Sequence, residues 1–156
     1  MLDIYPMLCY NSTIKGTERE WIKMNKNYGY IYNGNYVNQR KYGVTKIGMT
    51  MNSPASRRAS IEASSGHKFR MAKYIRIENI TKEDLLFVES WVRRSMAQVD
   101  GLTYDAQSND HFTFSIEKGQ KYDQFDALAD FAMSYAVDAL RFMGYAENTY
   151  RIKICK

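Results

Sequence analysis

Residues 28–37 read YGYIYNGNYV, and this stretch decides the fold class. Tyrosine and isoleucine favour extended backbone, while Asn33-Gly34 is a residue pair typical of tight hairpin turns. Residues 42–49 form the next strand candidate. The pattern therefore predicts antiparallel strands with a chain reversal at Asn33-Gly34.

The rest of the chain alternates helix and strand signals. A serine followed by proline begins the first predicted helix (53–64), because the hydroxyl caps free amides and proline has no N–H to leave unbonded. A capping-box pattern begins the second, whose apolar residues recur at helical spacing (81–99). The same spacing predicts a long amphipathic helix over 122–143. Extended segments are expected over 67–78 and, more briefly, over 111–116.

Length and composition favour one domain of the α+β class. The chain has 156 residues, of which 45% are hydrophobic and 25% charged, the balance of a globular protein. We expect an antiparallel three-stranded sheet flanked by helices over residues 28–116, which form the core. An extension (1–27) with one short helix over 17–26 precedes this core, and an amphipathic helix with a basic tail (117–156) follows it.

Several classes of protein are excluded by what the sequence lacks. No run approaches the roughly 18 apolar residues of a membrane span. Cys9 and Cys155 have no cysteine or histidine partner at metal-ligand spacing, which argues against zinc fingers and disulfide scaffolds. The first ten residues lack a basic start and a long apolar stretch, so we expect a cytoplasmic protein.

Positive charge is concentrated in one part of the chain. Residues 38–77 contain nine basic residues and one acidic residue, Glu62, so this segment has a charge of +8. Because the net charge of the chain is +5, the remaining residues together carry −3. Such a block suits a face that contacts phosphates, since cations that bind a nucleic acid release its counterions. A solvated basic face without a ligand is an equally good interpretation.

One carboxylate stands out from the helical pattern. Glu89 follows Leu85 by four residues and precedes Val92 by three, so a helix places it in the apolar stripe. A buried carboxylate needs a cation, a hydrogen-bond donor or a metal ion beside it. Geometry alone favours a salt bridge to an arginine over a catalytic role.

Several of these residues together match a known pattern. Gly29-Tyr30-Ile31-Tyr32, then Lys46-Ile47-Gly48-Met49-Thr50, then Arg57 and Glu89 resemble the GIY-YIG nuclease superfamily, most closely its phage and bacterial branch with Lys-Ile-Gly as second motif. The resemblance covers residues 28 to about 116, and Arg57 follows Gly48 at the spacing of that branch. Tyr30 occupies the place of the first motif's glycine, so Tyr32 is the motif tyrosine, with Tyr30 as the alternative.

The resemblance implies a metal-dependent DNA endonuclease that cuts or nicks duplex DNA, of the kind that phages and mobile elements encode. Tyr32, Lys46, Arg57 and Glu89 would surround one scissile phosphate, with Glu89 holding Mg²⁺ or Mn²⁺ and Lys46 favouring the phenolate form of Tyr32. The expected substrate contacts are Tyr30, Arg58, Lys68, Arg70 and Lys73.

Two other functions stay open, a degenerate relative that binds nucleic acid without cutting it and a structure-selective repair nuclease. The long C-terminal helix could pack on the core or form a homodimer interface, and packing is the commoner arrangement.

Overall fold

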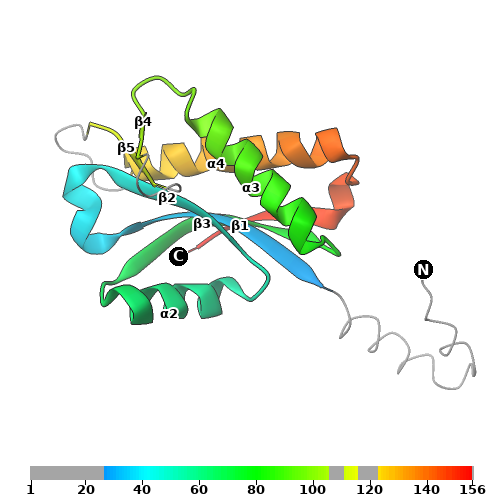
Figure 1. Ribbon diagram of the computed structural model, residues 1–156, viewed down its shortest axis with the longest axis horizontal. Helices are drawn as coiled ribbons and strands as arrows, with labels where there is room; N and C mark the ends of the chain where they lie inside the picture. Colours follow the sequence, from blue (N-terminus) through cyan, green and yellow to red (C-terminus); the bar gives the residue numbers. More distant parts are fainter. Residues whose placement is uncertain (1–26, 106–110, 116–122, 156) are drawn as a thin grey trace, which may run out of the picture.

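The structure is a computed structural model that describes residues 27–105, 111–115 and 123–155 (Figure 1). Its strands are β1 (Tyr28–Tyr36), β2 (Val44–Thr50), β3 (Phe69–Glu78), β4 (Thr103–Tyr104), β5 (His111–Thr113) and β6 (Tyr150–Ile154). Its helices are α2 (Pro54–Ser65), α3 (Lys82–Met96) and α4 (Asp123–Met143), with short 3-10 helices η3 (Val37–Tyr42) and η4 (Glu147–Thr149). The helix predicted over 17–26 lies outside the described residues.

The α+β class is confirmed, but the prediction of three strands is wrong. In the described part of the chain the sheet has six strands, all paired antiparallel, in the order β4-β5-β2-β1-β3-β6. The three expected strands form its centre. At one edge the basic tail adds β6, whose sequence YRIKI alternates apolar and basic residues with the period of a strand. At the other edge the short β5 and β4 extend β2.

The predicted hairpin turn at Asn33-Gly34 is also wrong. Strand β1 runs through both residues with only a bulge between them. The buried Asn33 amide donates to Thr45 Oγ1 at 3.0 Å and to the Lys46 carbonyl at 3.1 Å, so tertiary partners hold it in the sheet. A side chain at Gly34 would lie 2.5 Å from the Arg70 carbonyl, so close strand packing explains this glycine. The chain reverses instead through η3.

The helix boundaries follow the predicted caps. Ser53 Oγ accepts from the Ser56 amide at 3.1 Å at the start of α2, and Gly66 ends this helix in the left-handed region with φ 75°. Thr81 Oγ1 accepts from the Asp84 amide at 3.1 Å at the start of α3. Local sequence therefore fixes where these helices begin, and the long helix α4 agrees with its predicted range within a residue.

The helices lie in two layers on opposite faces of the sheet (Figure 1). Helices α3 and α4 cover one face and share its main apolar core with Ile31, Ile47 and Ile75. Helix α2 lies on the other face, where Ile61 packs with Tyr32 in a smaller cluster. The C-terminal helix thus packs on the core of its own chain. Within the described part of the chain, no helix has the length and apolar character needed to cross a membrane.

Candidate active site

Tyr32 and Arg57 meet on the face that α2 covers. The Tyr32 ring is fully buried, and its hydroxyl oxygen accepts a hydrogen bond from Arg57 Nε at 3.2 Å. Gly48 lies directly opposite Tyr32 in the β1–β2 register, and a Cβ at Gly48 would overlap the Tyr32 hydroxyl. The glycine of the second motif therefore lets the tyrosine of the first motif lie across β2 and reach the arginine of α2.

Lys46 belongs to the same face as this pair. It precedes Gly48 by two residues on β2, so its side chain projects to the same side of the sheet. The residue is buried, with 8% of its surface exposed. His111 pairs with Lys46 in the β2–β5 register, and its ring stacks on Tyr36 at 6.3 Å between centroids. The position of His111 beside Lys46 was not predicted, because the pairing of β5 with β2 brings together segments that are distant in the sequence.

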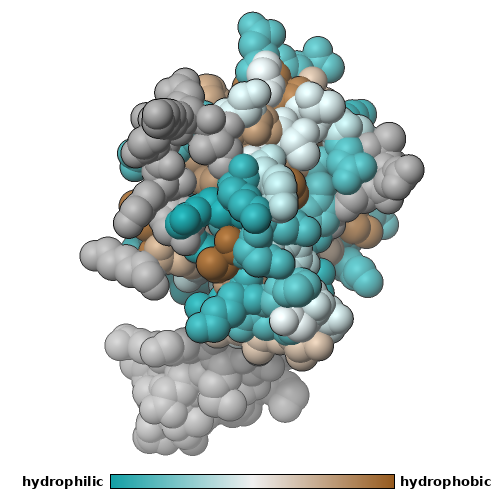
Figure 2. Space-filling model, turned by 90° about the vertical axis from the view of Figure 1, so that its left-hand side faces the viewer, coloured by the Kyte–Doolittle hydropathy of each residue, from teal (hydrophilic) through white to brown (hydrophobic). Residues whose placement is uncertain are grey.

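A cleft of about 720 Å³ lies between α2 and β3 on this face. Its lining includes three of the predicted substrate contacts, Arg58, Lys68 and Arg70, and also Tyr74 and Cys155. Burial raises the pKa of the Cys155 thiol, while Arg58 and Arg70 act in the opposite direction. Figure 2 shows that hydrophilic residues predominate on the end of the molecule that carries η3. Glu62 also lines the cleft, and Arg70 pairs with Asp126, so the lining keeps only a small excess of positive charge, next to α2, the helix that carries Arg57.

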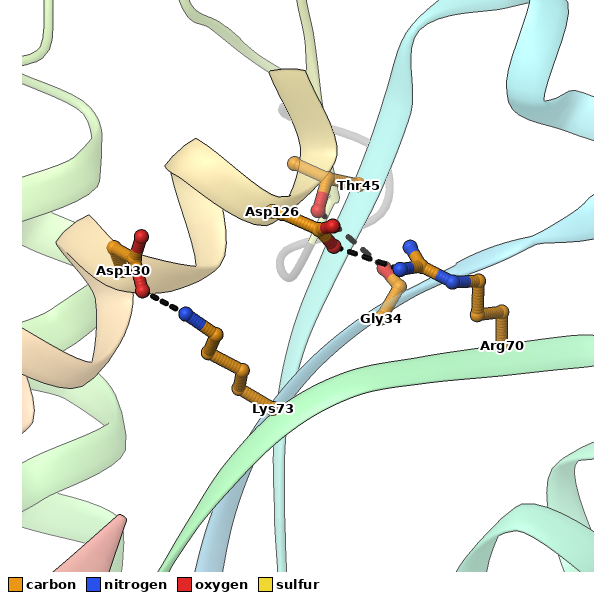
Figure 3. Close-up of polar contacts among 6 residues, drawn as sticks. All are labelled: Gly34, Thr45, Arg70, Lys73, Asp126 and Asp130. Carbon is orange, nitrogen blue, oxygen red and sulfur yellow. Dashed lines mark hydrogen bonds and ion pairs between the residues drawn. The ribbon is translucent and has the colours of Figure 1, made fainter. Parts of the chain in front are cut away.

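Two predicted substrate contacts form ion pairs with α4, in the layer on the opposite face (Figure 3). Arg70 Nη2 lies 2.7 Å from Asp126 Oδ1, and Lys73 Nζ contacts Asp130 Oδ1. Both cations come from β3, whose register shifts at the bulge opposite Asn33 and Gly34. The structure therefore uses these charges to hold α4 on the sheet, and it does not bring Lys73 to the cleft.

Tyr30 lies on the Tyr32 face but outside the arginine contact. Its ring packs edge-on against Tyr74, with 5.7 Å between centroids. Burial raises the pKa of the Tyr30 phenol, Arg76 opposes this, and the neighbouring Tyr74 and Tyr28 add to it. The phenol therefore stays protonated at neutral pH. Of the two candidate motif tyrosines, Tyr32 is the one whose hydroxyl accepts a hydrogen bond from the Arg57 guanidinium.

Glu89 comes from α3, which covers the face of the sheet opposite α2, so the structure places Glu89 in a different layer from the Tyr32–Arg57 contact. It is buried at 9% exposure, and its Oε1 accepts a hydrogen bond from Arg93 Nη1 at 3.3 Å, one helical turn away. The buried carboxylate thus has the cationic partner that its position required. Among residues 27–105, 111–115 and 123–155, no group of three His, Cys, Asp or Glu side chains is arranged to hold a metal ion. A magnesium ion bound through Glu89 would need water and phosphate oxygens as its other ligands, which is usual for Mg²⁺.

Comparison with known proteins gave no match to any family model, curated protein or solved structure. The resemblance to GIY-YIG nucleases therefore stays a prediction from the motif residues.

Proposed function

We propose that this protein is a metal-dependent DNA endonuclease of the GIY-YIG type. The observation that supports this most strongly is the contact between Tyr32 and Arg57 over Gly48. Tyr32, Gly48 and Arg57 come from three separate sequence motifs. The buried position of the Tyr32 hydroxyl depends on the absence of a side chain at Gly48, and the hydroxyl is in turn the hydrogen-bond partner of Arg57. The order of elements, β1, β2, α2, β3 and α3, also follows the order of the motifs.

Arg57 would bind the scissile phosphate. Its Nε is directed at Tyr32, which leaves the two terminal amino groups of the guanidinium to bind phosphate oxygens in a bidentate manner. Negative charge grows on those oxygens as water attacks phosphorus. A guanidinium fixed in place by Tyr32 stabilises that charge without reorganising.

Tyr32 and Lys46 would handle the proton of the attacking water. Tyr32 has the Arg57 guanidinium on its oxygen and Lys46 on the same face, and both cations would offset the cost that full burial places on a phenolate. A phenolate there can accept a proton. Lys46 would also attract the phosphate backbone, because it places a positive charge on this face of the sheet.

Glu89 is the residue that would hold the metal ion. A bound Mg²⁺ or Mn²⁺ polarises the phosphate and stabilises the leaving oxygen. Glu89 fits as a single hard oxygen ligand, provided that Arg93 yields part of its hold on Oε1. The remaining residues of the site act on the water and the phosphate directly.

The Glu89–Arg93 ion pair also favours a second candidate, a protein that binds DNA without cutting it. A carboxylate already neutralised by a guanidinium attracts a metal ion less strongly. Such a protein would keep the basic cleft and lose only the metal-dependent step.

Cleavage of supercoiled plasmid tests the proposal. Purified full-length protein is incubated with Mg²⁺, with Mn²⁺ and with a chelator. We expect metal-dependent nicked or linear product, a loss of at least about 100-fold in Arg57→Ala and no product in Glu89→Gln. Arg141→Ala and Glu147→Gln are matched controls, since these two residues form an exposed ion pair at the end of α4, and both should cut normally.

Each alternative outcome has a distinct meaning. Full activity of Glu89→Gln, or cleavage in the chelator, would overturn the metal-dependent mechanism. Retention of DNA in a gel shift without any cleavage under either metal would select the binding protein.

A further inference from the structure

A set of tyrosines and cations shares the open part of the face that carries Tyr32. In the strand registers Tyr30 lies opposite Arg76, and Tyr74 lies opposite Lys153. Residues opposite each other in a sheet project to the same side. We call this set the tyrosine–arginine platform, and its members are Tyr28, Tyr30, Tyr74, Arg76, Arg151 and Lys153.

The rings of the platform form a continuous row. Tyr74 contacts Tyr30 at 5.7 Å between centroids, Tyr30 contacts Tyr28 at 6.5 Å, and the Arg76 guanidinium lies 4.8 Å from the centroid of Tyr28. All three rings are only half-buried. Because Tyr74 also lines the cleft beside α2 with Arg58, the row leads away from the candidate active site.

The cations of the platform differ from those beside α4. Arg70 and Lys73 each pair with an aspartate, whereas no described carboxylate forms an ion pair with Arg76, Arg151 or Lys153. Glu78 lies at the far end of the same face, next to Arg76 and Arg151. Three cations against one carboxylate leave the platform positive.

We propose that the tyrosine–arginine platform binds single-stranded DNA, so that unpaired nucleotides run from the scissile phosphate along Tyr74, Tyr30 and Tyr28. Rows of aromatic rings flanked by cations suit single strands, because unpaired bases stack on the rings while the cations follow the phosphates. A duplex keeps its bases stacked on each other and cannot use the rings. That the single strand is DNA rather than RNA rests on the proposed function. The substrate of the proposed endonuclease would then be DNA that contains an unpaired segment.

Binding measured without cleavage tests the platform. Fluorescence anisotropy in a chelator compares labelled oligothymidine of about 20 nucleotides, which is longer than the roughly 4–16 nucleotides of a usual single-strand site, with a duplex of the same length. We expect tighter binding of the single strand, roughly tenfold weaker binding for Tyr30→Ala, and near-normal binding for Tyr30→Phe, which keeps the ring. Phe142→Ala is the control, since Phe142 is an exposed aromatic residue of α4 with 71% exposure.

The salt dependence of the binding constant is a second test. It uses substitutions of exposed residues, which should not disturb the fold. Arg151→Ala should reduce the slope of log K against log salt concentration by about 0.7, the value for one phosphate contact on a single strand. Arg141→Ala should leave the slope unchanged.

Equal or tighter binding of the duplex, or an unchanged slope in Arg151→Ala, would overturn the platform. Tighter binding of oligouridine would overturn the choice of DNA. A protein that binds the single strand as expected but never cuts plasmid would retain the platform and lose the endonuclease. If the parent protein cuts plasmid normally, but Tyr30→Ala and Arg151→Ala bind the single strand as tightly as the parent does, the endonuclease proposal stands and the platform is overturned.

Discussion

The two faces of the sheet are built from the same strands but carry different kinds of side chain. On the face covered by α3 and α4, apolar side chains form the main core, and the β3 cations Arg70 and Lys73 are neutralised by Asp126 and Asp130. On the face covered by α2, tyrosines and cations predominate, and Arg57 meets Tyr32. The difference shows that one strand can supply stability on one side and a candidate binding surface on the other.

The helices explain why only one face stays open. Helix α4 has 21 residues and buries eight of them, whereas α2 has 12 residues and buries only Ile61. Burial of apolar surface is the main stabilising term in folding. The α4 side therefore carries most of the stability, which leaves the α2 side able to keep polar and charged groups next to solvent.

Two neighbouring residues of β3 test this division most strongly. Ile75 is fully buried in the main core, and Tyr74 projects to the other face. We expect Ile75→Ala to lower the free energy of unfolding by about 2–5 kcal/mol, and Tyr74→Ala to lower it by less while weakening binding of single-stranded DNA. Urea unfolding and anisotropy on the same preparations measure both. Equal losses of stability would show that the two faces contribute alike.

Gly48→Ala sharpens the comparison within the α2 face. The new methyl group would overlap the Tyr32 hydroxyl, so we expect an overpacking cost of about 1–3 kcal/mol in the free energy of unfolding. In a Tyr32→Ala background the same substitution should cost much less, because the ring that it meets is gone. A double-mutant cycle measures this coupling. Additive losses in the cycle would mean that Gly48 serves some purpose other than making room for Tyr32.

The smallest effect concerns the α3–α4 side at high pH. The Tyr145 hydroxyl donates to Asp84 Oδ2 at 2.6 Å, and burial together with this carboxylate raises the pKa of Tyr145 to about 12. The unfolded chain has a tyrosine pKa of about 10. The stabilisation is therefore complete below pH 10 and is lost as the pH rises from about 10 to about 12.

Tyr145→Phe removes this contribution. We expect the free energy of unfolding to fall less steeply with pH above 10 in Tyr145→Phe than in the parent protein, measured by urea unfolding. Tyr135→Phe is the control, because Tyr135 packs on Phe131 of the same helix rather than on a carboxylate. Parallel pH profiles for the parent and Tyr145→Phe would contradict the role of the Asp84 contact.

Local signals predicted the helices well and the sheet only in part. Serine and threonine caps and glycine at a left-handed position act within a few residues, so α2 and α3 begin where Ser53 and Thr81 indicate. The Asn33-Gly34 signal failed because Thr45 and Lys46, which are distant in sequence, hold Asn33 in an extended strand. The strand β6 carried an alternating pattern that could have predicted it.

The candidate site shows the same limit. The motif order and spacing pointed to Tyr32, Lys46, Arg57 and Glu89, and the apolar stripe placed Glu89 correctly as a buried carboxylate with a cationic neighbour. The pattern could not separate cations that bind α4 from cations that remain for a ligand. That distinction depends on which face each residue of β3 occupies, and a bulge shifts the faces along the strand.

The sequence by itself determined the α+β class, the helix ends and the set of candidate site residues, because caps, periodicity and charge are local properties of the chain. Only the tertiary structure decided that Gly48 makes room for Tyr32, that Arg70 and Lys73 hold α4, and that β6 adds cations beside Tyr74 and Arg76. These arrangements depend on strand register and on the packing of distant segments. Both are set by contacts between residues that no short stretch of sequence contains.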